Sequence, residues 1–225
     1  MNTEHPSTRP GHRPRRDTAA LPNAEPAAQR PVARRPQGAD VRVRILGVGS
    51  MAVGSVEAMG AHSVGFARGD RVAFPLNREE RAVLTAEDEA GGMGSVVVSA
   101  ERLLGVPRDV GTEQAARLLA PGLVTRVLLR QLRPIRTGDG VRVDLEPGVV
   151  RAVVAAWATA LGATLDDGSS PVDVILDEES LREAHAIAFR RGHLQVGSAD
   201  VFAAIRDGVF DDVLDTVATG RQAAA

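Results

Sequence analysis

The stretch VRVDLEPGVVRAVVAAWATALGATL at residues 141–165 decides the fold. Its first five residues, 141–145, are mostly apolar and β-branched, which is typical of a strand. Apolar side chains then recur at spacings of four, three and four, on one face of a helix: Val150, Val154, Trp157 and Leu161. The stretch therefore predicts a strand followed by a helix, with Trp157 in the core.

The alternation of strand and helix continues to the end of the chain. It predicts a parallel sheet with flanking helices. The expected elements are a strand at 172–176, a helix at 179–190, a strand at 193–196 and a helix from about 198 to 207.

The preceding residues, 41–111, predict a small β domain. Val41, Val43 and Ile45 alternate with arginines, which is the period of a half-buried strand, and glycines separate the short apolar runs that follow. A helix is then expected from Thr112, with its hydroxyl as N-cap, up to a break at 121–122 (Pro-Gly), followed by a second helix through Leu132.

Residues 1–40 differ in composition from the rest. They hold seven of the 13 prolines and seven arginines against four acids, and they have few large apolar side chains. We expect a disordered, solvated tail that does not bind nucleic acid, because its arginines are scattered and no aromatic residue lies among them. No signal peptide or membrane span is expected, so we expect a cytoplasmic protein.

The composition excludes several chemistries. The 225 residues include no Cys, no Tyr and no Lys, so all 27 basic residues are arginines. A disulfide framework, a thiolate nucleophile, a Walker-type phosphate loop and a Schiff base are therefore excluded. The five histidines are dispersed, without a pair at ligand spacing, so no metal site is expected.

Five segments, taken in order, resemble the medium-chain dehydrogenase/reductase superfamily and specifically its zinc-free quinone and enoyl reductases. They are VRVRILGVG from 41, GFARGDRVAF from 65, SVVVSAERLLGVP from 95, EQAARLLAPGLVTRVLLRQLRPIRTGDGVRV from 113 and VVAAWATALGAT from 153. The resemblance implies an α/β protein with a reduced GroES-like domain at 41–111 and a shortened Rossmann-like domain at 112–225. It also implies NAD(P)H in the cleft between them.

The chain departs from the family where the cofactor phosphates would bind. The family's glycine-rich turn falls on residues 148–151, and only Gly148 is retained. Val149 and Arg151 are bulky where the main chain must approach a diphosphate, and Glu146 adds a negative charge. Gly148 and Arg151 are the candidate cofactor-binding residues, since the Arg151 guanidinium could grip a phosphate from further away.

The ribose side is shortened as well. Residue 165 leads through a short loop almost directly into the next strand, where the family has a further helix and strand. Asp166 or Asp167 could serve as a ribose-binding acid, about 20 residues beyond the glycine turn, but two solvated acids are the preferred interpretation. Part of the family's substrate wall is also absent from the β domain.

Two residues are candidates for catalysis. Asp144 ends the strand at 141–145, at the edge where open α/β sheets bind ligands, and it could form a polar cluster with Glu146 and Arg151. His193 is either a structural residue at a strand edge, which is preferred, or an acid or base in the cleft. Ordinary helix capping is the preferred interpretation of these acids.

Three functions remain open. The preferred one is a reduced reductase relative without a cofactor, which has lost NAD(P)H hydride transfer and binds an apolar, polyketide-like small molecule or transforms it by cyclisation or isomerisation. The alternative is an NAD(P)H-dependent quinone or enoyl reductase. The weaker alternative is a structural subunit that pairs as a homodimer through a sheet edge.

Overall fold

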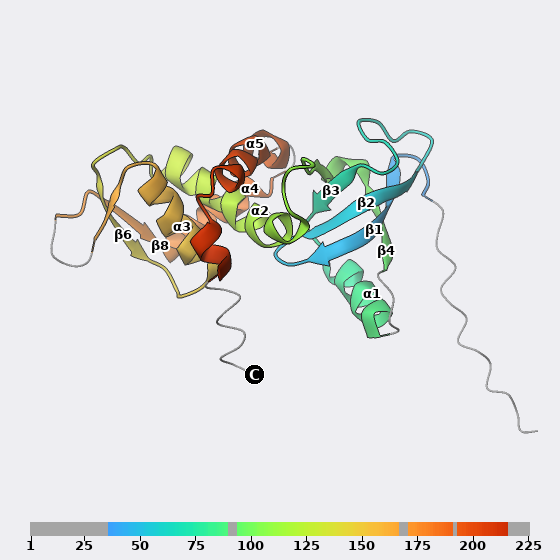
Figure 1. Cartoon of the computed structure of the whole chain (residues 1–225), viewed down its shortest axis with the longest axis horizontal. Coiled ribbons are helices and arrows are strands. Elements are labelled where there is room, and N and C mark those ends of the chain that lie inside the picture. The colour runs from blue at the N-terminus through green and yellow to red at the C-terminus, as the bar shows by residue number, and fades with distance from the viewer. Residues whose placement is uncertain (1–35, 90–93, 167–170, 191–192, 216–225) are drawn as a thin grey trace, which may run out of the picture. The chain divides into compact units, whose positions relative to one another are not determined.

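An antiparallel sheet of five strands precedes a cluster of helices and a second, parallel sheet (Figure 1). The computed structural model describes residues 36–89, 94–166, 171–190 and 193–215. Most of the expected tail, at 1–35, and Asp167 lie outside the described residues. None of the helices formed by the described residues combines the length and the apolar sequence that a membrane span requires.

The antiparallel sheet has the strand order β4-β1-β2-β3-β5. Its strands are β1 (Asp40–Val48), β2 (Ala52–Met59), β3 (Arg71–Phe74), β4 (Ser95–Ser99) and β5 (Leu104–Gly105). Val41, Val43 and Ile45 are buried, at most 4% exposed, which confirms the strand predicted from their alternation. A 3-10 turn, η1 (Ala100–Arg102), joins β4 to β5.

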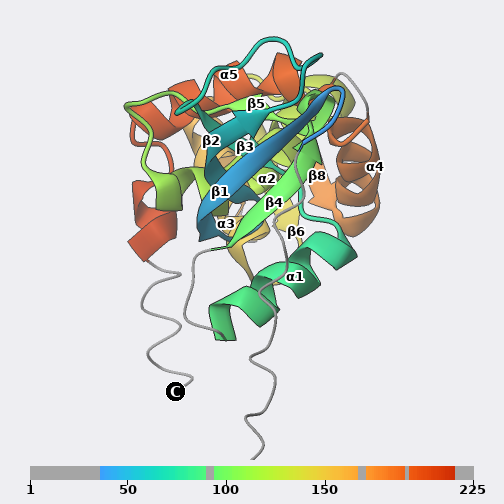
Figure 2. The ribbon, with the colours of Figure 1, turned by 90° about the vertical axis from the view of Figure 1, so that its right-hand side faces the viewer.

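Helix α1 (Arg78–Glu89) was not predicted. It contacts β4 (Figure 2). Asn77 caps it reciprocally: the Glu80 N–H donates to Asn77 Oδ1 at 2.8 Å, and the Asn77 N–H donates to Glu80 Oε2 at 2.8 Å. The motif Asn-x-x-Glu at 77–80 is the signal that could have revealed this helix.

Helix α2 (Thr112–Val127) passes through Pro121 without a break and continues into a π-helical turn, η2 (Leu128–Leu132). The expected break at 121–122 is therefore wrong, and Gly111 is the N-cap instead of Thr112. Pro121 has no N–H for the Arg117 carbonyl. The Ser50 hydroxyl, in the turn between β1 and β2, donates to that carbonyl at 3.0 Å and replaces the missing donor.

The same turn lies very close to α2. The single Ser50 hydroxyl hydrogen is shared with the Ala116 carbonyl, whose oxygen lies 2.9 Å from Ser50 Oγ, and the Met51 N–H also donates to that carbonyl at 3.0 Å. A Cβ on Gly49 would stand 2.6 Å from the Ala116 carbonyl oxygen. Glycine is therefore required at position 49 for this contact.

The parallel sheet has the order β7-β6-β8. Its elements, with the helices that follow them, are β6 (Gly140–Asp144), α3 (Val149–Ala160), β7 (Thr164–Leu165), β8 (Val174–Asp177), α4 (Glu178–Ala188) and α5 (His193–Arg206). The predicted strand, helix and sheet arrangement from 141 to 190 is confirmed.

The expected strand at 193–196 is wrong, because these residues form the first turn of α5. The apolar side chains follow a helical period: Val201, Phe202 and Ile205 are buried, whereas Val196 is 69% exposed. Gly197 packs on α2, where an added Cβ would stand 3.0 Å from Leu123 Cδ2. Burial of this face against α2 outweighs the β-like local sequence.

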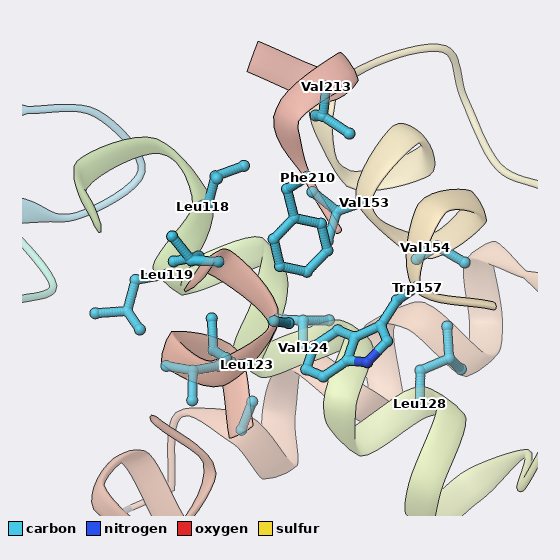
Figure 3. Packing of buried hydrophobic residues seen from close by; sticks show 14 of the residues in the cluster. Leu118, Leu119, Leu123, Val124, Leu128, Val153, Val154, Trp157, Phe210 and Val213 are labelled. Carbon is cyan, nitrogen blue, oxygen red and sulfur yellow. The ribbon is translucent and has the colours of Figure 1, made fainter. Parts of the chain in front are cut away.

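The main core lies among α2, α3, α4 and α5. Trp157, 6% exposed, meets Phe210 edge to face with ring centroids 5.6 Å apart (Figure 3). Met51, in the turn between β1 and β2, and Val53, in β2, belong to the same buried cluster. The expected core position of Trp157 is confirmed.

Candidate functional site

The carboxyl edge of the parallel sheet is the candidate site. From β6 the chain passes through α3 to β7 on one side, and then crosses to β8 on the other side of β6. Such a reversal creates a crevice outside the carboxyl ends of β6 and β8. Asp144 and Asp177 pair across β6 and β8 at this edge.

Four acidic residues lie at this edge or just after it: Asp144, Glu146, Asp177 and Glu178. Asp177 caps α4 by accepting the Ser180 N–H at 2.8 Å, and this hydrogen bond holds the pKa of Asp177 below its usual value. Glu178 Oε1 accepts the Glu146 N–H at 2.9 Å. A carboxylate therefore already occupies a main-chain donor of the loop between β6 and α3.

Arg151, in the first turn of α3, is exposed and donates from Nη1 to the Leu145 carbonyl at 3.2 Å. Gly148 is the N-cap of α3 and has an extended backbone, with φ 161° and ψ −176°. An added Cβ there would meet no heavy atom within 4 Å. No close approach of other protein atoms explains a glycine at position 148.

A pocket of about 330 Å³ lies beside β6. Its lining residues come from β6, β7, α3 and the residue after β7: Val141, Arg142, Val143, Asp144, Arg151, Ala155, Leu165 and Asp166. The structure thus brings the predicted residues Asp144 and Arg151 to one pocket. Glu146 is not among its lining residues.

Asp166 forms part of this pocket wall and is paired with Arg142. Its Oδ2 lies 2.7 Å from Arg142 Nη2, and its side chain is 2% exposed. The interpretation of Asp166 as a solvated loop acid is therefore wrong. Arg142 lies between two valines in the strand, and a charged side chain in such a position needs a partner of opposite charge. This pattern could have indicated a nearby acid such as Asp166.

The histidines do not join this site in the described part of the chain. His193 begins α5 rather than a strand edge, and its side chain lies outside the described residues. The His185 ring stacks on Phe189, with centroids 4.7 Å apart. Among the described residues, no group of three His, Asp or Glu side chains is placed to hold a metal ion.

The chain is similar in sequence to a quinone oxidoreductase from Pseudomonas aeruginosa. The two are 34% identical over 122 residues, which cover 53% of this chain and 34% of that protein. The chain therefore spans about a third of the length of this curated relative. No family model matches the chain.

Solved structures share the fold. A quinone oxidoreductase from Pseudomonas syringae pv. tomato has a TM-score of 0.55 and 19% identity, over 83% of this chain and 84% of that one. A 2-haloacrylate reductase has a TM-score of 0.56 and 19% identity, over 78% and 82%. A mycobacterial quinone oxidoreductase has a TM-score of 0.55 and 17% identity, over 78% and 83%. They confirm the predicted α/β fold class, a GroES-like sheet followed by a shortened Rossmann-like sheet.

Proposed function

We propose that this chain, a relative of the zinc-free quinone and enoyl reductases of the medium-chain dehydrogenase/reductase superfamily, has lost nicotinamide-dependent hydride transfer. It binds an apolar small molecule, or transforms one by a non-redox cyclisation or isomerisation. The observation that carries this proposal is the hydrogen bond between the Glu178 carboxylate and the Glu146 N–H.

The residues at the carboxyl edge do not fit a dinucleotide diphosphate. In this fold the diphosphate binds main-chain N–H groups at the first turn after the strand and at the helix N-terminus. Here Glu178 accepts one of these N–H groups. Each carboxylate about 6 Å from a phosphate charge would add roughly 1–3 kcal/mol of repulsion at an effective dielectric constant of 20–40.

Arg151 offers limited compensation. Its guanidinium donates to the Leu145 carbonyl, beside the same loop. The other arginine of the pocket, Arg142, is paired with Asp166. The cations that line this pocket are therefore engaged with neighbouring groups of the chain, which supports loss of the cofactor.

Asp144 is the side chain best placed to move a proton in the pocket. It is exposed, it lines the pocket beside Arg151, and no hydrogen bond or ion pair of its side chain occurs in the described part of the chain. A carboxylate of this kind can take a proton from one carbon of a conjugated carbonyl compound and return it to another. Such an isomerisation consumes no reductant. A role of His193 in the same step stays a prediction.

The mass of the product distinguishes the two chemistries. The full chain is incubated with a panel of conjugated carbonyl compounds, with and without NADPH. The proposal expects a product of unchanged mass that forms without NADPH and is lost in Asp144→Asn. A product two hydrogens heavier, formed only with NADPH, would refute it.

The names of the relatives favour the alternative, an NAD(P)H-dependent quinone or enoyl reductase. Its assay is NADPH consumption with a panel of quinones. If Arg151 grips a phosphate, Arg151→Asp abolishes that consumption. Absence of consumption in the unmodified chain counts against this alternative.

A structural role is the third candidate, favoured by one observation. β7 and β8 are the edges of the described parallel sheet, and Ile175 in β8 is 46% exposed. Two copies could pair through such an edge. Light scattering of the full chain tests this: a monomer at high concentration excludes it.

A further inference from the structure

A second pocket, of about 560 Å³, lies in the antiparallel-sheet half of the chain. It shares no lining residue with the pocket beside β6. Its volume is in the range of small-molecule sites. The wall is made by the loop that enters β3 and by the segment that follows β5: Gly65, Phe66, Gly69, Asp70 and Arg71, with Gly105, Val106, Pro107 and Arg108.

Part of this wall is apolar. Phe66 is partly buried and packs against the apolar cluster of the antiparallel sheet, and Val106 is 6% exposed. Gly105, in β5, has no heavy atom within 4 Å of an added Cβ. The aromatic ring, the valine and the open space at Gly105 suit a flat apolar body.

Two arginines, Arg71 and Arg108, also line the pocket. Arg71 is half-buried and donates to the Pro107 carbonyl at 3.1 Å, the Val110 carbonyl at 2.7 Å and Thr112 Oγ1 at 3.1 Å. These acceptors are all neutral. In the described part of the chain no ion pair includes Arg71 or the exposed Arg108.

One acid lines the pocket. Asp70 Oδ2 accepts the Ala67 N–H at 2.7 Å, within its own turn. The lining therefore holds two arginines and one aspartate, whose carboxylate already accepts a hydrogen bond. An anionic ligand group would restore the balance, and a guanidinium is the residue type best shaped to bind a carboxylate.

We propose that this pocket binds a small organic anion, a carboxylate on an aromatic body. The aromatic body lies against Phe66 and Val106, and the carboxylate pairs with Arg108. This site does not depend on the function proposed above, because the two pockets have no lining residue in common.

The test is isothermal titration of the full chain with 1-naphthoate. The neutral analogue 1-naphthylmethanol has the same ring system without the charge. We expect saturable binding of 1-naphthoate, with a dissociation constant of about 1 mM or tighter, and binding of the alcohol at least about tenfold weaker.

Three variants locate the binding. Gly105→Leu fills the open space with a side chain and should abolish binding, while Arg108→Gln should weaken it at least about tenfold. Arg130→Gln, an exposed arginine on η2, makes the same charge change outside the pocket and should leave binding unchanged. Circular dichroism and melting temperature check that each variant is folded.

Three results would contradict a binding site for an aromatic carboxylate in this pocket. Equal binding of 1-naphthoate by Arg108→Gln and the unmodified chain would overturn the proposal, and so would equal binding of acid and alcohol. Absence of saturable binding up to about 10 mM would do the same. If Gly105→Leu does not fold, the comparison of the two probes and the two arginine variants still decides.

Discussion

The hydrogen bond from Ser50 to helix α2 should make the effects of substitutions at Ser50 and Pro121 on stability depend on each other. Ser50 Oγ donates to the Arg117 carbonyl, the acceptor that Pro121 leaves without a helical partner. Ser50→Ala removes this hydrogen bond together with the contact of the same hydroxyl with the Ala116 carbonyl. Because the site is exposed and water can replace the hydroxyl, we expect a loss of about 1 kcal/mol in the free energy of unfolding.

A double-mutant cycle with Pro121→Ala isolates the coupling. Alanine at position 121 supplies an N–H to the Arg117 carbonyl, so Ser50→Ala should cost about half as much or less in that background. Thermal unfolding followed by circular dichroism measures each variant, and about 1 kcal/mol corresponds to roughly 2–4 °C for a chain of this size. Ser198→Ala, which removes an exposed hydroxyl bonded to the Gln195 carbonyl, is the control and should show no coupling. An equal cost of Ser50→Ala in both backgrounds would show that the Ser50 hydroxyl does not replace the donor missing at Pro121.

Three further changes test the fold. Gly49→Ala should lower the melting temperature by more than Ser50→Ala, because its Cβ would stand 2.6 Å from the Ala116 carbonyl oxygen; an unchanged melting temperature would mean that the turn does not rest on α2. Trp157→Ala should cost about 3–5 kcal/mol, measured by urea unfolding, because it leaves a cavity beside Phe210. Asp177→Ala should destabilise the chain at neutral pH. Because the pKa of Asp177 is lowered in the folded state, its stabilisation is complete above its ordinary value of 3.8 and is lost as pH falls through the folded pKa, so melting curves of the two chains should converge in acid.

The sequence predicted correctly those helices and strands in which the spacing of apolar residues matches the side chains that are buried in the structure. The strand at 141–145 and the helix carrying Trp157 are both present, because each apolar face meets the core that its spacing implies. The break at Pro121 was predicted wrongly, because the donor that replaces the missing hydrogen bond comes from Ser50, 67 residues from its acceptor. The sequence pattern around Pro121 cannot reveal a hydrogen-bond donor so far away in the chain.

The part of the candidate site that comes from nearby residues of the sequence was predicted, and the part that depends on distant contacts was not. Asp144 and Arg151 lie near each other along the chain, and the structure places both at one pocket. The pairing of Asp166 with Arg142 and the contact of Glu178 with the Glu146 N–H depend on the register of three strands. The chain order alone does not fix that register.

We propose that the Glu178 carboxylate takes a main-chain donor that the cofactor phosphates need, and calorimetric titration of NADPH into the full chain measures the consequence. We expect no saturable heat for the unmodified chain. We also expect Glu178→Ala to move NADPH binding towards the measurable range, and Glu179→Ala, with the same charge change at the next residue, to do so less. Micromolar binding of NADPH by the unmodified chain would contradict this proposal.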